Sequence, residues 1–185
     1  MDAAPPTPSQ PSLFRRLKNA YDARAPVRWV VDLGLFALIL SAVGLWQTRA
    51  HVHGGPVPAF TLPSLSGAPV QSSSLTGKPT LLAFWAPWCG VCEAESSNVS
   101  RVKKLLGDRA SVVSVATAFT SMDQVTAYTQ RNGVDYPVLI DDGALAEQLK
   151  VTSFPTVYFL DERGHIKGSV VGYSTTAGLL LRTMW

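Results

Sequence analysis

The only two cysteines of the 185-residue sequence lie three positions apart, at Cys89 and Cys92. Cysteines this close cannot connect distant parts of a fold, which excludes a framework of structural disulfides. Two kinds of chemistry are left, reversible thiol–disulfide exchange or half of a metal site. The surrounding segment WAPWCGVC follows an apolar run of strand length and opens a segment with helical spacing. We therefore predict that the pair lies where a strand gives way to a helix.

The start of a helix is a favourable place for a reactive sulfur. Its free backbone N–H groups and partial positive charge stabilise a thiolate relative to a thiol. We expect the pKa of Cys89 to fall below the value of about 8.5 that a free cysteine has. Cys92 lies one helical turn further on, where its sulfur can reach that of Cys89. Cys89 is thus predicted to be the exposed attacking thiolate and Cys92 the buried resolving thiol, with exchange through a mixed disulfide.

Other residues are predicted to serve this centre. A proline at the entrance to a sheet strand is unusual. We therefore interpret Pro155, after Phe154, as a cis-proline whose backbone faces the disulfide and holds a partner chain in extended form. Trp88 is expected at the active-site surface, so these three residues are candidates for partner binding. Glu95 follows Cys92 by three residues, and a partly buried carboxylate there could move protons for the buried thiol.

The elements that must position these residues follow from the apolar pattern of the later part of the chain. Apolar runs of strand length alternate with segments of helical spacing. The predicted elements are a hairpin at Phe60–Leu62 and Val70, strands at Thr80–Trp85, Ser111–Ala116, Val138–Ile140, Thr156–Leu160 and Ile166–Val171, and helices at Cys89–Leu106, Met122–Arg131, Ala144–Lys150 and Thr175–Arg182. Asp141 and Asp142 are placed to cap the third helix. Strands this apolar need cover on both faces, so the fold class is predicted to be α/β with a central mixed sheet.

The N-terminal part differs in composition and is predicted to attach the chain to a membrane. Residues 1–28 begin with a Pro- and Ser-rich stretch too polar to pack and continue with five basic residues, which indicates a disordered, basic cytoplasmic tail. Residues 29–46 are apolar apart from Asp32, Ser41 and the glycines. A helix of this length spans about 27 Å, enough for a thin hydrocarbon core. We expect an uncleaved transmembrane anchor, with a cleaved signal peptide and a buried core helix as alternatives.

Residues 47–58, QTRAHVHGGPVP, are predicted to be a linker because they contain glycine and proline and show no periodicity. His51 and His53 are interpreted as solvated, although two such histidines could bind a metal ion. Residues 59–185 then form the exported domain. Eleven basic and ten acidic residues follow Trp46, so the net charge of +3 reflects the basic tail. Without a basic face on the folded part, a nucleic-acid partner is not expected.

WAPWCGVC, the downstream FPT, the pair TVYFL and IKGSVVG, and the position of Glu95 resemble the thioredoxin superfamily. The segment FTLPSLSGAPVQSSSLTGKPTLLAFWAPWC is similar to its TlpA/ResA/CcmG-like branch, and within it to the membrane-anchored ScsD-like group. The resemblance covers about residues 56–185. It implies a thioredoxin-like three-layer α/β/α sandwich, a redox-active Cys89–Cys92 pair, a cis-Pro155, and Trp88 beside the active site.

Two departures from thioredoxin itself bear on the chemistry. Ala83 stands where thioredoxin carries a buried aspartate below the cysteines, so Glu95 is the expected substitute in proton transfer. Gly90-Val91 replaces a Gly-Pro dipeptide that tunes the reduction potential, which ranges from about −270 to −120 mV among related proteins. Glu93 is expected to be an ordinary solvated helix residue.

These features predict a thiol–disulfide oxidoreductase with a single membrane-spanning helix in a bacterial inner membrane and its catalytic domain in the periplasm. It should exchange disulfides with exported proteins, need no cofactor and no metal, and depend on a membrane redox partner for electrons. Two alternatives stay open. Cys89 and Cys92, together with His51 or His53, could bind or deliver Cu(I) or Zn(II), since soft thiolates suit Cu(I). A thiol peroxidase shares the fold, but those enzymes have threonine where this chain has Ala86. The direction of electron flow is not predicted.

Overall fold

The computed structural model describes residues 25–49 and 54–185. The chain divides into two compact units, Met1–Leu45 and Trp46–Trp185. Most of the predicted tail, residues 1–28, falls outside the described residues. His51 and His53 of the predicted linker also fall outside them.

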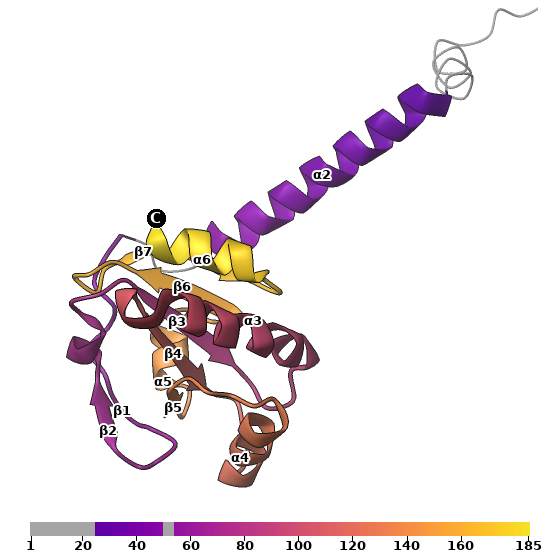
Figure 1. The fold of residues 1–185 in the computed structure, drawn as a ribbon. Coiled ribbons are helices and arrows are strands. Elements are labelled where there is room, and N and C mark those ends of the chain that lie inside the picture. The colour runs from indigo at the N-terminus through magenta and orange to yellow at the C-terminus, as the bar shows by residue number, and fades with distance from the viewer. Residues whose placement is uncertain (1–24, 50–53) are drawn as a thin grey trace, which may run out of the picture. The chain divides into compact units, whose positions relative to one another are not determined.

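One helix, α2 (Ala25–Arg49), accounts for everything that the structure describes before residue 54 (Figure 1). Its many leucine and alanine residues favour a helix. From Trp29 to Ile39 every side chain is exposed, although most of these side chains are apolar. Among the described residues, no helix is both long enough and apolar enough to cross a membrane.

The second unit is built on a five-stranded sheet (Figure 1). Its strands are β3 (Thr80–Trp85), β4 (Ser111–Ala116), β5 (Val138–Ile140), β6 (Thr156–Leu160) and β7 (Ile166–Val171). They lie in the order β5-β4-β3-β6-β7. The β5–β4 and β4–β3 pairs are parallel, whereas β3–β6 and β6–β7 are antiparallel. The sheet is therefore mixed, as predicted, and all five strands occupy their predicted ranges.

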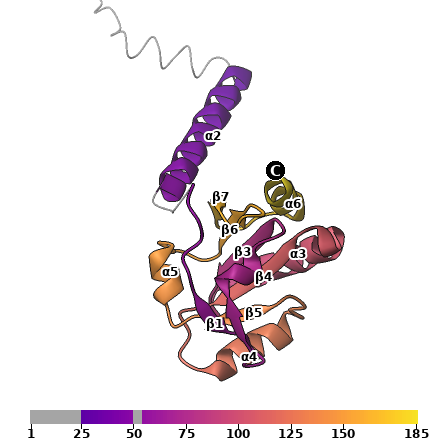
Figure 2. The same ribbon diagram turned by 90° about the vertical axis from the view of Figure 1, so that its left-hand side faces the viewer.

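Helices cover both faces of this sheet. They are α3 (Gly90–Leu106), α4 (Met122–Arg131), α5 (Ala144–Gln148) and α6 (Thr176–Met184). Side chains alternate between the faces of a strand. Leu81, Ala83 and Trp85 of β3 pack in the clusters that include α3, α4 and α6, whereas Leu82 and Phe84 pack with α5. Figure 2 shows α5 on one side of the sheet and α3 and α6 on the other. This α/β/α layering is the predicted arrangement.

Local sequence explains both ends of α3 and the start of α5. α3 starts after its N-cap residue, Cys89, and stops at Gly107, whose φ of 53° lies in the left-handed region that favours glycine. The predicted cap of α5 is present, because the Asp141 carboxylate accepts the backbone N–H groups of Leu145 and Ala146, each at 3.0 Å. α5 ends earlier than predicted, since the backbone turns into the left-handed region at Lys150, with φ of 57°.

A short hairpin precedes the main sheet, and two 3₁₀ turns lie between the larger elements. Strands β1 (Thr61–Pro63) and β2 (Pro69–Gln71) form the predicted hairpin, followed by a 3₁₀ turn at Ser72–Leu75. A second 3₁₀ turn, Gly107–Arg109, follows α3.

Part of the predicted linker belongs to the folded domain. Gly54 N donates to Ile166 O at 2.9 Å, and Ile166 N donates to Gly55 O at 2.8 Å. Val57 N donates to Gly164 O at 2.9 Å. The chain is therefore paired with the β6–β7 turn from residue 54 onward, earlier than residue 59, where the domain was expected to begin.

Candidate active site

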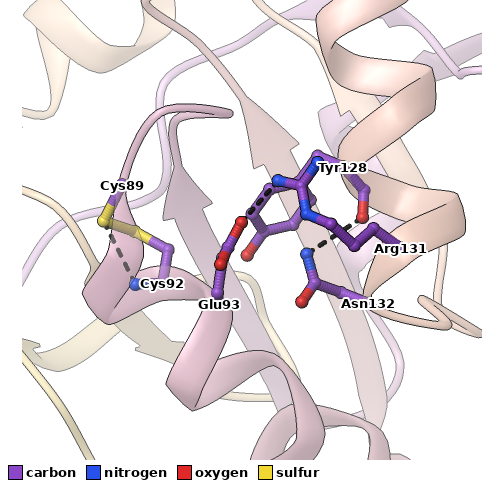
Figure 3. A network of polar contacts seen from close by, with 6 residues as sticks. All are labelled: Cys89, Cys92, Glu93, Tyr128, Arg131 and Asn132. Atoms are coloured by element: carbon purple, nitrogen blue, oxygen red, sulfur yellow. Dashed lines mark hydrogen bonds and ion pairs between the residues drawn. A yellow bond between two sulfur atoms is a disulfide. The ribbon is translucent and has the colours of Figure 1, made fainter.

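Cys89 and Cys92 are joined by a disulfide where the loop after β3 enters α3 (Figure 3). Cys89 is the N-cap residue and Cys92 lies in the first turn of the helix. Their Cα atoms are 5.3 Å apart, and the backbone N–H of Cys92 donates to Cys89 Sγ at 3.1 Å. After reduction, the same N–H group and the helix N-terminus would stabilise a negative charge on that sulfur.

Both cysteines are buried in this disulfide state, Cys89 with 6% and Cys92 with 3% of its surface exposed. The predicted contrast between an exposed Cys89 and a buried Cys92 is therefore wrong for the oxidised protein. Apolar packing is the reason, since the pair belongs to a cluster that includes Trp85, Val125 and Tyr128. Access for a partner thus depends on the side chains that border the disulfide.

Trp88 is the exposed aromatic side chain closest in sequence to the pair, with 67% of its surface accessible. Its Nε1 donates to the carbonyl oxygen of Ala118 at 2.8 Å. Its ring also meets Phe154 edge-on, with the ring centroids 5.8 Å apart. Ala118 has a φ of 51°, which is uncommon for a residue with a Cβ atom. An exposed aromatic ring that is held in place by two contacts is well suited to receive a protein partner.

The peptide bond between Phe154 and Pro155 is cis, as predicted. Pro155 is buried, and its carbonyl oxygen accepts the backbone N–H of Gly172 at 2.8 Å. Phe154 packs against the cluster that contains both cysteines. The fold therefore brings Trp88, Phe154 and the cysteine pair together from segments far apart in the sequence.

Glu95 is more deeply buried than predicted, with 2% of its surface exposed. Burial raises the pKa of its carboxyl group to about 7, although the bonds from Ser174 oppose this shift. One of those bonds runs from the backbone N–H of Ser174 to Oε1 of Glu95 at 2.8 Å. A carboxyl group with a pKa near neutrality can both take up and release a proton under ordinary conditions. Among the described residues, the Glu95 carboxyl group is hydrogen-bonded to Ser174 in the loop before α6 and to neither cysteine.

The sequence did not predict two contacts at the site, those of Glu93 and Tyr128. Glu93 is not simply solvated, because it forms an ion pair with Arg131 at the end of α4. Tyr128 stacks on Trp85, with the ring centroids 4.0 Å apart, and belongs to the same apolar cluster as the disulfide. The amphipathic pattern of α4 was a signal that Tyr128 faces the core, but nothing in the pattern indicated which residues it would meet.

Within the described part of the chain, no three His, Cys, Asp or Glu side chains come together as a possible metal site. His51 and His53, which the copper-binding alternative would use, are outside that part. In the disulfide state neither Cys89 nor Cys92 carries the negative charge of a thiolate, which is the form of cysteine that binds metals.

Comparisons with known proteins agree with this geometry. A profile of the AhpC/TSA family matches residues 53–169. The thioredoxin-like protein YneN of Bacillus subtilis is 33% identical, over 80% of this chain and 92% of its own length. The thiol-disulfide oxidoreductase ResA of the same organism is 26% identical, over 80% of this chain and 87% of ResA.

Among solved structures, a secreted disulfide oxidoreductase of Mycobacterium tuberculosis, described as homologous to DsbE of E. coli, superposes with a TM-score of 0.61. It is 28% identical and the match covers 68% of this chain and 94% of the other. The predicted thioredoxin-like fold is therefore confirmed for the second unit.

Proposed function

This chain belongs to the AhpC/TSA family and is a thiol–disulfide oxidoreductase, and we propose that it uses Cys89 and Cys92 to exchange disulfides with exported proteins. The enzyme class follows from its relatives, which are thiol–disulfide oxidoreductases of the ResA and DsbE type. These relatives also confirm the resemblance to the ResA-like branch that FTLPSLSGAPVQSSSLTGKPTLLAFWAPWC indicated. The observation that carries the residue assignment is the disulfide itself, which lies at a helix N-terminus in the apolar cluster against which Phe154 packs.

The exchange needs no group beyond the two sulfurs and a proton carrier. In the reducing direction, the Cys89 thiolate attacks a disulfide of the partner, forms a mixed disulfide and releases one partner thiolate, which takes up a proton. Cys92 then loses its proton and attacks the Cys89 sulfur. This step releases the second partner sulfur as a thiol and closes the Cys89–Cys92 disulfide. Two electrons and two protons pass to the partner, and the reverse sequence oxidises it.

The neighbouring residues have roles in this scheme. Glu95 takes the proton from Cys92 as that thiol becomes the nucleophile, which suits a carboxyl group whose pKa is raised to about 7. Trp88 and Phe154 present the apolar surface on which the partner chain lies. The backbone at Pro155 holds that chain in extended form.

The proposed location is the outer side of a bacterial inner membrane. Support comes from the sequence of residues 29–46, from the basic residues before them, and from a relative that is a secreted protein. The apolar side chains that α2 exposes would be unfavourable in water and favourable in lipid. Exported compartments are generally oxidising, so a reductase there needs electrons from a membrane redox partner.

Single cysteine replacements test the assignment. Cys89→Ser should abolish turnover with a disulfide-containing peptide, because the attacking sulfur is gone. In Cys92→Ser the first step remains but the second is blocked, so a covalent mixed disulfide between Cys89 and the peptide should accumulate. Non-reducing mass spectrometry would detect this adduct. Two results would show that the roles are assigned wrongly. One is turnover by Cys89→Ser. The other is an adduct that accumulates on Cys92 in Cys89→Ser but not on Cys89 in Cys92→Ser.

A further inference from the structure

The strongest feature that the proposed chemistry does not use is the ion pair between Glu93 and Arg131. Glu93 lies in the first turn of α3, four residues after Cys89, and Arg131 is the last residue of α4. Figure 3 shows the carboxylate and the guanidinium meeting between the two helices, at the same end of α3 as the cysteine pair. Both side chains are partly exposed, at 38% for Glu93 and 56% for Arg131.

The charges of Glu93 and Arg131 act on an ionisable group in the apolar cluster that contains the disulfide. Tyr128, in the same cluster as the two cysteines, has a raised pKa. Burial is the main cause, the charges of Tyr136, Glu93 and Glu95 raise it further, and Arg131 lowers it. Arg131 and Glu93 therefore act with opposite sign on an ionisable group in this cluster.

The two charges must also act with opposite sign on a thiolate at Cys89. An acidic residue in the first turn favours the helix but opposes a second negative charge at the helix N-terminus. A cation at the same end of the helix favours that negative charge. Arg131 extends from α4 to pair with Glu93. Its positive charge offsets the repulsion that Glu93 would otherwise exert on the Cys89 thiolate.

We propose that Arg131 tunes the redox chemistry, because its pairing with Glu93 holds a cation at the N-terminal end of α3, where its positive charge stabilises the reduced, thiolate form of the Cys89–Cys92 pair. The inference rests on the proposed role of Cys89 as the attacking sulfur. A disulfide whose reduced form is stabilised is more oxidising. Arg131 therefore makes the pair more oxidising than Glu93 alone would leave it.

The test measures two properties of full-length variants. Arg131→Gln leaves Glu93 unpaired and should raise the Cys89 pKa by about half a unit, a modest shift because both groups are partly exposed. Glu93→Gln should lower it by a similar amount. The pKa is read from thiolate absorbance and from the pH dependence of alkylation. In equilibrium with glutathione, Arg131→Gln should be more reducing and Glu93→Gln more oxidising, by about threefold in the equilibrium constant.

Two variants separate charge from structure. Arg131→Lys keeps the charge and should keep the wild-type values. Lys104→Gln breaks another ion pair of α3, with Asp135 at 3.7 Å, about three turns further along the helix, and should leave the Cys89 pKa unchanged. Repeating the measurements in a Glu95→Gln background removes the titration of Glu95, while Tyr128 and Tyr136 stay neutral at these pH values.

An ion pair that only joins α3 to α4, without acting on Cys89, predicts different pKa shifts in these variants. If Arg131→Gln and Glu93→Gln shift the Cys89 pKa in the same direction, or shift it no more than Lys104→Gln does, the inference is overturned. If wild-type Cys89 itself alkylates like a free cysteine, the proposed role of Cys89 fails instead. Circular dichroism of each variant confirms that the fold is retained, which is expected because the pair lies at the surface.

Discussion

Glu95 is a carboxyl group in a place where a negative charge is costly. Only 2% of its surface is exposed, and the backbone N–H of Ser174 donates one hydrogen bond to it. Burial outweighs that bond and raises its pKa from 4.5 to about 7. Between these two values the folded protein holds a proton that the unfolded chain has already released.

This difference predicts how stability depends on pH. The folded state binds the proton of Glu95 more tightly than the unfolded chain does. This preference adds to the free energy of unfolding, fully below pH 4.5, and the added stability is lost as the pH rises through about 7. Glu95→Gln cannot ionise, so it should remove this loss, which amounts to at most about 3 kcal/mol. Urea unfolding of the oxidised protein at pH 4.5, 6 and 8 measures the effect without interference from the thiols.

The exposed Glu162 provides the control, since Glu162→Gln should leave the pH profile as it is in the wild type. The prediction is wrong if Glu95→Gln loses stability between pH 4.5 and 8 as steeply as the wild type does. The pH profile of thiol alkylation then addresses the chemistry of the same variant. An unchanged alkylation profile would remove Glu95 from the proton transfer proposed for Cys92.

At the scale of elements, apolar runs between turn residues were sufficient to place the strands. Thr80–Trp85 and Ser111–Ala116 are such runs, and both strands lie where they were predicted. The end of α5 was not predictable in this way. A left-handed Lys150 carries no sequence signal, because the residue has no preference for that conformation. It turns the chain toward the loop that ends in Phe154 and the cis-proline.

The start of α5, in contrast, depends on a single side chain. Asp141 is fully buried, and its two oxygens accept the N–H groups of Leu145 and Ala146. Asp141→Ala should lower the free energy of unfolding by about 3 kcal/mol, because two buried N–H groups lose their acceptors. Asp142→Ala should lower it by less than about 1 kcal/mol, since this exposed carboxylate accepts only the N–H of Ala144. Equal losses in urea unfolding would show that burial of the cap does not matter.

For the whole molecule, contacts between distant segments are what sequence analysis could not provide. Glu93 looked solvated because its partner, Arg131, lies on a different helix. The exposure of Cys89 was predicted wrongly because the apolar cluster around it is assembled from several elements. Gly54 looked like part of a linker because its partner, Ile166, lies in the last β-hairpin. The cis-proline was predictable, because proline is rare beside an inner strand of a sheet and its position there was visible in the sequence.

The proposed membrane attachment can be tested on the whole chain. If residues 29–46 form an anchor, the full-length protein should stay with membranes after alkaline carbonate extraction. A chain that starts at Gly54 should be released as a folded and active domain, because it keeps the pairing of residues 54–57 with the β6–β7 turn. Leu38→Arg places a charge in the middle of the apolar run at a cost of about 3 kcal/mol, so it should weaken membrane retention.

Leu181→Arg is the matched control. Leu181 is 72% exposed on α6, outside the apolar run, so the same change there should leave retention unchanged. Mass spectrometry of the mature protein separates the anchor from a signal peptide. A product that begins near Ala50 would show cleavage, and complete extraction of an intact chain by carbonate would rule out an anchor. Loss of retention with turnover preserved would show that residues 29–46 determine where the enzyme acts and leave its chemistry unchanged.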